Sequence, residues 1–438
     1  MATRILSLVA AVLLLLFALV LAVSGTGGAI VAIGLVLLVV ALVCWGPERV
    51  GFGFLVLAFG TAPMYKGLAP EGALATPTDL CLVAGFALLL PRLLGNRFGL
   101  PARYVLAVAV IFATGIIGSF VSSTPASSLV ALFFWIGTMF GLPVAIHLWR
   151  PDNRTVQVLV WSFVAGHMVS TFYGLAAGRI GDGRLYGLTN HPNYFAESGV
   201  IAFGLLLHLL ATSRHKVIIW AAFAVTLYSV YASGSRAGTL ALAAIVACIP
   251  FVERSAMKAY ALALMAAGGA VVLATQWSRL ASGDSSLGRL TGGGSAAGSD
   301  IERTRGLHAG WHLFLQHPLT GSGLIAENLF TVHNNYLESA IAIGIFGTIA
   351  FLVVLYTLGK PLLGLHPSRR LCYTVVGYAV FGATTPGLYD RTYWVAMSLS
   401  IIVVAATWAE SRPPGNDVPV RTDLLPRPPL VPVTPMLR

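Results

Sequence analysis

One histidine and four arginines of this chain stand in polar segments that border long apolar runs. His333 begins a polar stretch that leads directly into an apolar run, and Arg303 and Arg305 lie upstream of it. Arg184 and Arg236 lie in two shorter polar loops. A guanidinium is always charged and binds phosphate oxygens in pairs, and a neutral histidine can accept the proton of an attacking hydroxyl. These residues predict a phosphorylated lipid as ligand, with arginines neutralising the charge on a pyrophosphate leaving group.

Neighbouring polar residues extend this prediction. The amides that follow Asn193 and His333 at predicted helix starts favour anion binding, so Asn193 and Asn334 are further candidates for substrate binding. The acids predicted on the same side form no paired cluster of the kind that a metal-assisted reaction uses. His308 and His312 have zinc-like spacing, but no third ligand accompanies them. We therefore expect neither a metal nor a cofactor.

Each candidate also has a structural interpretation. His333 alone would often be an interfacial histidine that bonds a carbonyl group, and Arg236 is equally well explained as a snorkelling side chain. A carboxylate within a span is costly, so we expect Glu197 and Glu338 to pair with arginines; for Glu338 the alternative is to orient an acceptor. Three further arginines are expected to be solvated or lipid-facing: Arg279, Arg289 and Arg391.

The composition indicates a polytopic membrane protein. The chain has 438 residues, of which 57% are hydrophobic and 10% charged, whereas soluble domains carry about 25% charged residues. The apolar runs are continuous rather than alternating, which favours membrane-spanning helices over a barrel. We expect an all-α bundle of 12 to 14 spans with an uncleaved first span. The candidates are 5–23, 28–45, 50–63, 77–95, 102–122, 126–149, 154–177, 194–213, 216–233, 237–253, 257–275, 334–358, 371–388 and 391–409.

The net charge of +11 reflects membrane topology rather than nucleic-acid binding. The predicted spans place about twice as many basic residues on one side as on the other, which orients the chain by the positive-inside rule. This orientation puts His333 and the arginine candidates on the outer face, and inner basic residues would contact anionic membrane lipids. The four cysteines fall within spans without metal-type spacing, and we expect no disulfide.

The chain divides into one membrane domain, 1–410, and a short tail. Residues 276–333 form the longest predicted loop, on the outer face. Its first part, 281–300, is rich in Gly and Ser and is expected to be mobile, whereas apolar residues recur at helical spacing from Ile301 and predict an amphipathic helix ending before Pro318. The proline-rich tail, 411–438, is expected to be a disordered cytoplasmic extension.

With these residues in view, the chain resembles the O-antigen ligase/polymerase superfamily of bacterial envelope glycosyltransferases. One ligase motif is a histidine, then Asn, Ser or Gln, nine residues, and Gly-x-x-Gly; it fits His333, Asn334, Gly344 and Gly347. We also expect these glycines to let a neighbouring helix approach closely.

Other segments carry the same resemblance. Arg303 with leucine four positions later fits the loop-helix motif, and the Pro318–Gly323 segment resembles the proline-glycine segment of the family. The loops that hold Arg184 and Arg236 resemble its two earlier arginine motifs. The likeness covers about 178–347 and the three spans predicted after it.

The resemblance implies about twelve spans and a metal-independent, inverting transfer of a glycan from undecaprenyl pyrophosphate to an acceptor hydroxyl. The acceptor would be a glycan, a lipid or a protein, and the site would face outward from the bacterial cytoplasmic membrane. By the same resemblance, His333 takes the role of base, Arg303 and Arg184 hold the diphosphate, and Arg236 supports them, with Arg305 a weaker candidate. Two alternatives stay open: a polymerase that uses the growing lipid-linked chain as acceptor, and a transporter without chemistry.

Overall fold

The computed structural model describes residues 26–69, 75–178, 180–181, 183–258, 260–261, 263–264, 286–290, 296–324 and 332–411. Several predictions fall outside these residues: the span at 5–23, most of the span at 257–275, Arg279, and the tail beyond residue 411.

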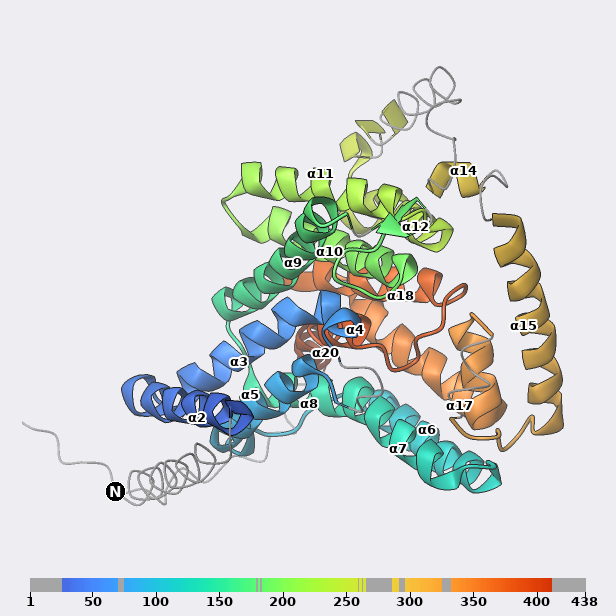
Figure 1. Cartoon of the computed structure of the whole chain (residues 1–438), viewed down its shortest axis with the longest axis horizontal. Coiled ribbons are helices and arrows are strands. Elements are labelled where there is room, and N and C mark those ends of the chain that lie inside the picture. The colour runs from blue at the N-terminus through green and yellow to red at the C-terminus, as the bar shows by residue number, and fades with distance from the viewer. Residues whose placement is uncertain are drawn as a thin grey trace, which may run out of the picture.

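The described chain is a bundle of helices with one two-stranded hairpin (Figure 1), which confirms the all-α polytopic prediction. Eight helical segments among the described residues are long and apolar enough to cross a membrane. They comprise α5 (Pro77–Leu94), α6 (Ala102–Val121), α7 with η2 and α8 (Pro125–Trp149), α9 (Asn153–Ala176), α10 (Pro192–Thr212), α12 (Arg236–Glu253), α17 with η3 (Asn335–Leu363), and α19 with α20 (Arg391–Glu410).

Shorter elements complete the bundle. They are α2 (Thr26–Trp45), α3 (Pro47–Thr61), η1 (Ala62–Met64), α4 (Tyr65–Leu68), strands β1 (Ile180–Gly181) and β2 (Arg184–Leu185), α11 (Lys216–Ala232), α14 (Ser286–Leu290), α15 (Ala296–Gln316), η4 (Pro367–Cys372) and α18 (Tyr373–Phe381). Within α2, the apolar part is Val31–Trp45. The predicted span 371–388 is therefore only partly helical, because α18 ends before a turn that contains Pro386 and Gly387.

Local sequence signals explain where the helices begin. Proline occupies the first helical position of α3, α5, α7 and α10, where its missing amide hydrogen costs nothing. Thr76 forms a capping box with Asp79 at the start of α5, Ser235 caps α12, and Asp390 caps α19. These starts matter because the polar residues of the site stand at or near them.

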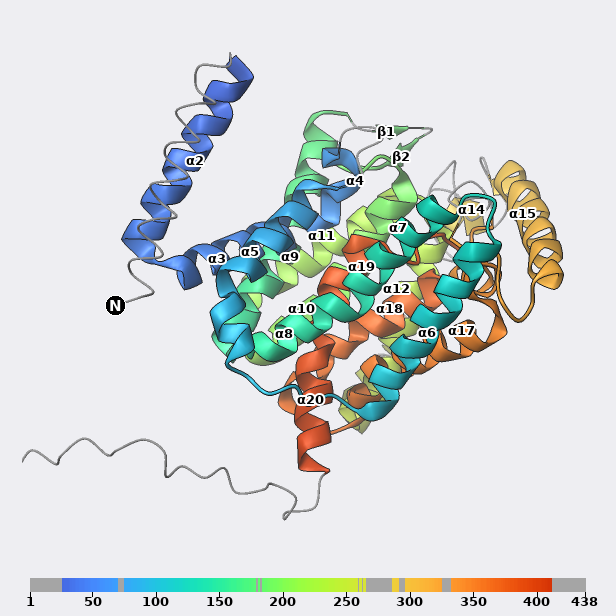
Figure 2. The same cartoon turned by 90° about the horizontal axis from the view of Figure 1, so that it is seen from below.

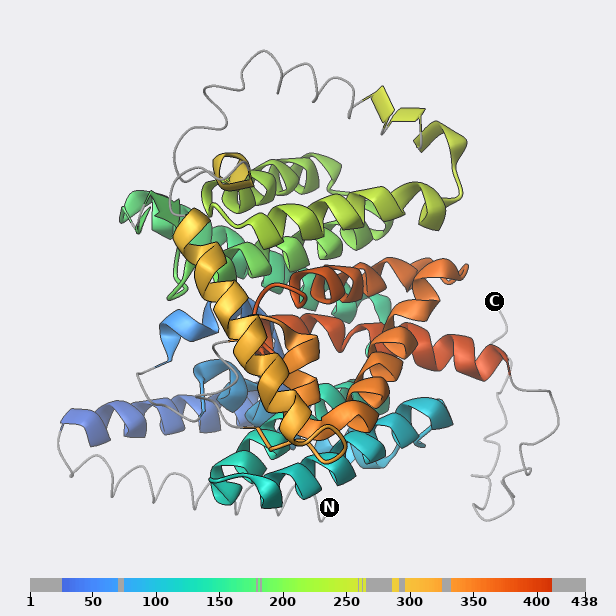
Figure 3. The same cartoon turned by 90° about the vertical axis from the view of Figure 1, so that its right-hand side faces the viewer.

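Helix α15 lies across one end of the bundle, in front of α17 (Figure 3). The hairpin, α4 and α14 gather at the same end, whereas α20 ends on the opposite side (Figure 2). The amphipathic helix is thus confirmed, but it begins at Ala296 rather than Ile301. The prediction of a mobile segment at 281–300 is wrong for 286–290 and 296–300, which are helical; burial of Arg289 and Ser286 against the bundle fixes the first of these.

Helix α17 is broken at Gly344, which has φ 67° and ψ −176°. The segment after α15 fills the break. Ser322 N donates to the Ile341 carbonyl at 2.7 Å, and Ile345 N donates to the Pro318 carbonyl at 2.9 Å. Backbone groups freed within an apolar layer need such partners. The break therefore attaches the end of α15 to the middle of α17.

The two motif glycines have different roles. Gly347 confirms the expected close approach, because an added Cβ would meet Thr114 Oγ1 of α6 at 2.6 Å. Gly344 differs from that prediction: its left-handed backbone makes the break, and an added Cβ would overlap the Leu319 carbonyl. Helix packing explains the first glycine, and backbone conformation the second.

Substituting Gly344 with Ala should strongly destabilise the fold. The conformation alone costs a side-chain-bearing residue about 1–3 kcal/mol, and the overlap with backbone atoms adds to this cost. Thermal unfolding in lipid nanodiscs measures the loss. The matched control is Gly53→Ala in α3, where an added Cβ has nothing within 4 Å; equal melting temperatures for the two variants would contradict the role assigned to the break.

Candidate functional site

A single turn between α11 and α12 brings three arginines together. Arg184 Nε donates to the Ser233 carbonyl at 2.8 Å, and Arg289 Nη1 donates to the Gly234 carbonyl at 3.1 Å. Arg236 is the first residue of α12, directly after this turn. Carbonyl partners orient a guanidinium, so the turn brings three guanidinium groups to one place.

Arg184 is held in place by two chain segments. It stands on β2, where Gly181 pairs with Arg184 across the hairpin, and its side chain is buried. Its Nη2 donates to Asn193 Oδ1 at 2.9 Å. Asn193, at the start of α10, therefore orients Arg184.

Arg303 extends the positive cluster onto α15. Burial, together with the charges of Arg236 and Arg289, lowers the pKa of the Arg303 guanidinium from its usual value. Asp300, one turn earlier on α15, forms a paired bond with Arg236, with Nη1 to Oδ2 at 2.9 Å. This ion pair holds α15 next to the turn, and its hydrogen bonds lower the pKa of Asp300.

His333 lies beside Arg303 in an unusual backbone conformation. Its φ is 50°, a region that non-glycine residues rarely adopt outside constrained sites. Its Nδ1 is buried and has no hydrogen-bond partner within the described part of the chain. Burial and the nearby charge of Arg303 lower the pKa of His333, and Glu302 opposes them. The ring is therefore neutral near pH 7.

His191 connects the two halves of this cluster. Its Nδ1 accepts from Asn193 N at 3.1 Å and caps α10. Although part of the side chain remains exposed, desolvation and the charges of Arg184, Lys66 and His333 lower its pKa to about 4. The charges of Arg184, Arg289 and His333 all act on His191. The arginine turn and His333 therefore lie around one region at the end of the bundle.

The remaining predicted residues are placed differently. Asn334 caps α17, where its Oδ1 accepts from the amides of Tyr336 and Leu337 at 3.0 Å each, and its Nδ2 donates to the Ala383 carbonyl. Its polar atoms thereby fix the residue next to His333. Arg305 is exposed, because two residues along a helix turn a side chain about 200° from that of Arg303. It lies outside the cluster.

A second group of charges was not predicted as a site. Lys66 Nζ lies 2.6 Å from Asp390 Oδ2 and 2.9 Å from the ring centroid of Tyr194. Burial lowers the pKa of Lys66, but Asp390 and the neighbouring Tyr65, Tyr194 and Glu197 together raise it well above its ordinary value. Burial raises the pKa of Asp390, but Lys66 and hydrogen bonds from Glu197 and Thr392 together lower it. Both side chains are therefore charged.

Two acids of the spans face this ion pair. Glu197 is fully buried and interacts electrostatically with Asp390 and Lys66. Glu338 is also buried, and it interacts with Lys66 and the Gly387 backbone. The expected arginine partners are therefore wrong for these acids, since Lys66 is the cation in range of both.

Arg391 and Arg289 also differ from expectation. Both are buried rather than solvated or lipid-facing. Arg391 makes a paired bond to Asp79, with Nε to Oδ1 at 3.0 Å and Nη2 to Oδ2 at 3.2 Å. The sequence separates Asp79 and Arg391 by most of the chain, so spacing gave no signal of this pair.

These features define a multi-pass membrane protein with a cation-rich polar site at one end of its bundle. Residues 221–352 match the family model Wzy_C, described as O-Antigen ligase. This match supports the O-antigen ligase/polymerase superfamily and, with it, a glycan-transfer function for a membrane enzyme. No curated protein matches the chain.

The matched range contains Arg236, Arg303, His333 and both motif glycines. The hairpin arginine and the Lys66–Asp390 pair lie outside it. The structure, rather than the family match, is what brings them near the motif residues.

Removing Lys66 should destabilise the protein by about 3–5 kcal/mol, because the Asp390 carboxylate stays buried and uncompensated. Removing Asp390 should cost less, because Lys66 is partly exposed and Glu197 lies in range of its charge. Lys66→Met and Asp390→Asn are suitable, since asparagine can still cap α19. The double variant should recover part of the loss in unfolding experiments in nanodiscs.

The matched control is Arg92→Met. Its pair with Glu48 spans 3.7 Å and is largely exposed, so its loss should cost less than about 1 kcal/mol. Strictly additive losses at Lys66 and Asp390 would show that the two charges do not stabilise each other.

Proposed function

We propose that this protein transfers a glycan from undecaprenyl pyrophosphate to an acceptor hydroxyl on the outer face of the bacterial cytoplasmic membrane. One observation carries the proposal: the charge of Arg303 acts on His333. The charges of His333, Arg184 and Arg289 in turn act on His191. A neutral ring thus adjoins a group of cations. The acceptor would be a glycan, a lipid or a protein.

The arginines would bind the pyrophosphate of the donor. Arg303 and Arg184 come from two elements and would contact the anion, and Arg236, which Asp300 pairs, would support them. Each guanidinium binds phosphate oxygens in pairs. As the glycosidic bond to phosphate breaks, the leaving pyrophosphate gains negative charge, which preorganised arginines stabilise without rearrangement.

His333 would act as the base. In this step the acceptor oxygen attacks the anomeric carbon, the hydroxyl proton passes to the ring, and the bond to the phosphate oxygen breaks with its electron pair. Attack opposite the leaving group inverts the anomeric configuration. The lowered pKa of His333 supports this role, because the neutral ring is the form that accepts a proton.

Other residues would position these groups. Asn193 orients Arg184, and Asn334 fixes the backbone beside His333. Glu338 lies buried on the α17 turn after His333, where it would orient an acceptor. The outer segment 276–333 would then belong to a single catalytic membrane domain, 1–410.

A polymerase would use the same chemistry with the growing chain as acceptor, and product length separates it from a ligase. A transporter is less well supported. Within the described spans, the buried His167 forms hydrogen bonds with two serine hydroxyls, at 2.9 Å to Ser198 and 2.8 Å to Ser229. These bonds explain His167 as a residue of the packed core rather than of a transport path.

Purified protein in nanodiscs, given a lipid-pyrophosphate glycan and candidate acceptors, should release lipid pyrophosphate both with and without chelator. His333→Ala, Arg303→Gln and Arg184→Gln should each lower kcat/KM by at least about a hundredfold, the usual scale for a lost base or oxyanion partner. His308→Ala, an exposed histidine on α15, is the matched control. Products of one length indicate ligation, and a ladder indicates polymerisation. Full turnover by His333→Ala would exclude the proposed base.

The pH profile provides an independent check. Because the pKa of His333 lies below its ordinary 6.5, kcat/KM should rise with pH on a limb centred below 6.5 and be flat near pH 7. Glu302 raises this pKa, so Glu302→Gln should move the limb to lower pH. A limb that moves the other way, or lies above 6.5, would contradict titration of His333.

A further inference from the structure

A groove of about 840 Å³ lies where several helices end. The last residues of α12 and α17 and the start of α6 line it, together with α18 and α20. Helices α12 and α17 both begin at the cation-rich site, at Arg236 and Asn335. From Asn335 to Leu355, where α17 reaches the groove, the distance along the helix is about 30 Å at 1.5 Å per residue. The groove is therefore separate from the proposed active site and lies toward the other end of the bundle.

The walls of this groove are largely apolar and face outward. Phe251 is 76% exposed and Leu363 is 63% exposed, whereas buried residues such as Val252 and Leu355 form the base. Two threonines also line the groove, but each hydroxyl donates to a carbonyl of its own helix. Exposed apolar surface of this extent on a membrane protein is suited to contact with lipid chains.

The rim of the groove is basic. Arg103 is on the first turn of α6, and its Cζ lies 5.8 Å from the ring centroid of Tyr356. Lys360 directly follows α17. Both side chains are exposed, and neither forms an ion pair with a described residue. No carboxylate is among the described residues that line the groove, so two positive charges stand at the mouth of an apolar space.

Two further arginines fix the shape of this rim. Arg254 Nη2 donates to the Leu363 carbonyl at 2.9 Å, and Arg369 Nη1 donates to the Gly364 carbonyl at 2.6 Å. These bonds attach the end of α12 and the start of η4 to the end of η3 and the residue after it. Because Lys360 belongs to η3, its backbone is held in place as well.

The acids near this end of the bundle do not cancel its charge. Glu253 accepts from Arg370 Nε at 2.7 Å and from Lys258 Nζ at 2.8 Å, so one carboxylate faces two cations. Glu410 is exposed at the end of α20. Cations therefore outnumber acids among the described residues around the groove.

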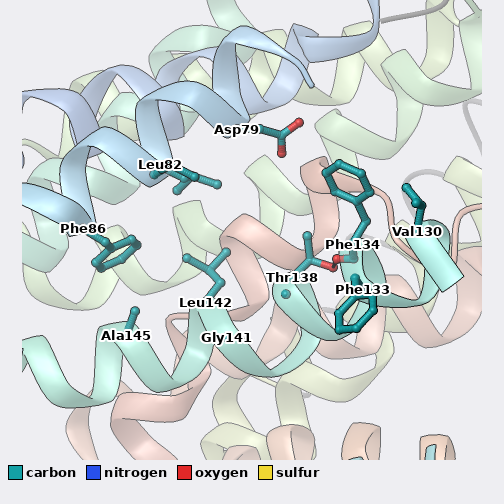
Figure 4. Close-up of a pocket in the computed structure, with 12 residues that line it drawn as sticks. Asp79, Leu82, Phe86, Val130, Phe133, Phe134, Thr138, Gly141, Leu142 and Ala145 are labelled. Carbon is teal, nitrogen blue, oxygen red and sulfur yellow. Dashed lines mark hydrogen bonds between the residues drawn. The ribbon is translucent and has the colours of Figure 1, made fainter. Parts of the chain in front are cut away.

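A second groove provides a contrast. It lies between α5 and the continuous helix formed by α7, η2 and α8 (Figure 4). Its charged lining residue is Asp79, whose carboxylate binds Arg391. No cation is among the described residues that line this second groove, so it has no group that would attract an anionic headgroup. The basic rim thus distinguishes the first groove.

We propose that the groove with the basic rim binds an anionic phospholipid, with its phosphate at Arg103 and Lys360 and its acyl chains against the apolar walls. Guanidinium and ammonium groups both form charge-assisted hydrogen bonds with phosphate oxygens. A zwitterionic headgroup carries a cation of its own, which the two basic side chains would repel. The site should therefore prefer phosphatidylglycerol to phosphatidylcholine.

The position and length of the groove agree with this ligand. If the proposed active site faces outward, the groove lies in the inner leaflet, where membrane proteins carry their excess of Lys and Arg and anionic lipids attract them. Along α20, from Val404 to Ser411, the lining extends for about 10 Å at 1.5 Å per residue. This length fits within one leaflet of hydrocarbon, which is about 15 Å thick, as a phospholipid does.

Trp408 lines the groove and can report its occupant. The protein is placed in phosphatidylcholine nanodiscs that contain increasing fractions of brominated phosphatidylglycerol or of brominated phosphatidylcholine. Subtracting the fluorescence of Trp408→Phe isolates the signal of Trp408. Half-maximal quenching should need about a tenfold smaller fraction of phosphatidylglycerol, because each Lys or Arg adds to the attraction for an anionic lipid. Equal quenching by the two lipids overturns the proposal.

Charge variants test the headgroup contact. In Arg103→Gln/Lys360→Gln the preference for phosphatidylglycerol should fall to about twofold or less. The matched control is Arg49→Gln/Arg154→Gln, which removes the same charge from two exposed arginines that do not line the groove, and it should keep the preference. A preference that survives in the groove variant, or that the control loses equally, overturns the proposal. If neither lipid quenches Trp408, a protein segment covers the groove, either from a second copy or from residues 412–438, and the proposal is also overturned.

Thermal unfolding gives a second measurement that does not use fluorescence. A ligand that binds the folded protein raises its melting temperature. Adding phosphatidylglycerol to phosphatidylcholine nanodiscs should therefore raise the melting temperature of the wild type and of the control, but not that of the groove variant. Equal rises in all three proteins overturn the proposal. Neither measurement requires glycan transfer, so an inactive protein with this lipid preference would contradict the proposed function and leave the lipid site in place.

Discussion

The break in α17 at Gly344 is the constraint on which the rest of the site depends. An interrupted helix in an apolar layer must find partners for its freed backbone groups, and here the segment after α15 provides them. The same insertion fixes α15 across the end of the bundle. Gly310 adds to this contact, since an added Cβ would meet Val332 at 2.8 Å and Leu337 at 3.2 Å. A backbone requirement thus sets the position of Arg303 relative to His333.

Charge is distributed unevenly at this end of the protein. Lys66 and Arg391 are each paired with a buried or partly buried carboxylate, as burial of a charge requires. Arg184 and Arg289 bond carbonyl oxygens of one turn, which fixes the direction of both guanidinium groups. The site therefore combines ion pairs that hold the scaffold with arginines that a single turn orients.

The helix bundle and the candidate residues were predicted from different features of the sequence. Apolar runs of sufficient length predicted the spans, because helix length and membrane thickness are directly linked. Polar residues beside those runs identified His333 and the arginines, which the structure then brings to one end. The sequence did not predict the interactions between residues that lie far apart in the chain. Nothing near Arg289 in the sequence indicates that it donates to the Gly234 carbonyl. Nothing near Arg391 indicates that it pairs with the Asp79 carboxylate. The same limit applies to Gly344, whose left-handed conformation exists only because a segment twenty residues earlier inserts beside it.

The central claim is that Arg303 faces an anionic site shared with Arg184, whereas Arg305 on the same helix does not. Equilibrium binding of undecaprenyl pyrophosphate to the purified protein in nanodiscs tests it most directly, without requiring an acceptor. Arg303→Gln and Arg184→Gln should each weaken binding by about tenfold or more, which corresponds to about 1.4 kcal/mol, and Arg305→Gln should bind as the wild type does. Equal losses at Arg303 and Arg305, or no loss at Arg303 and Arg184, would contradict the account.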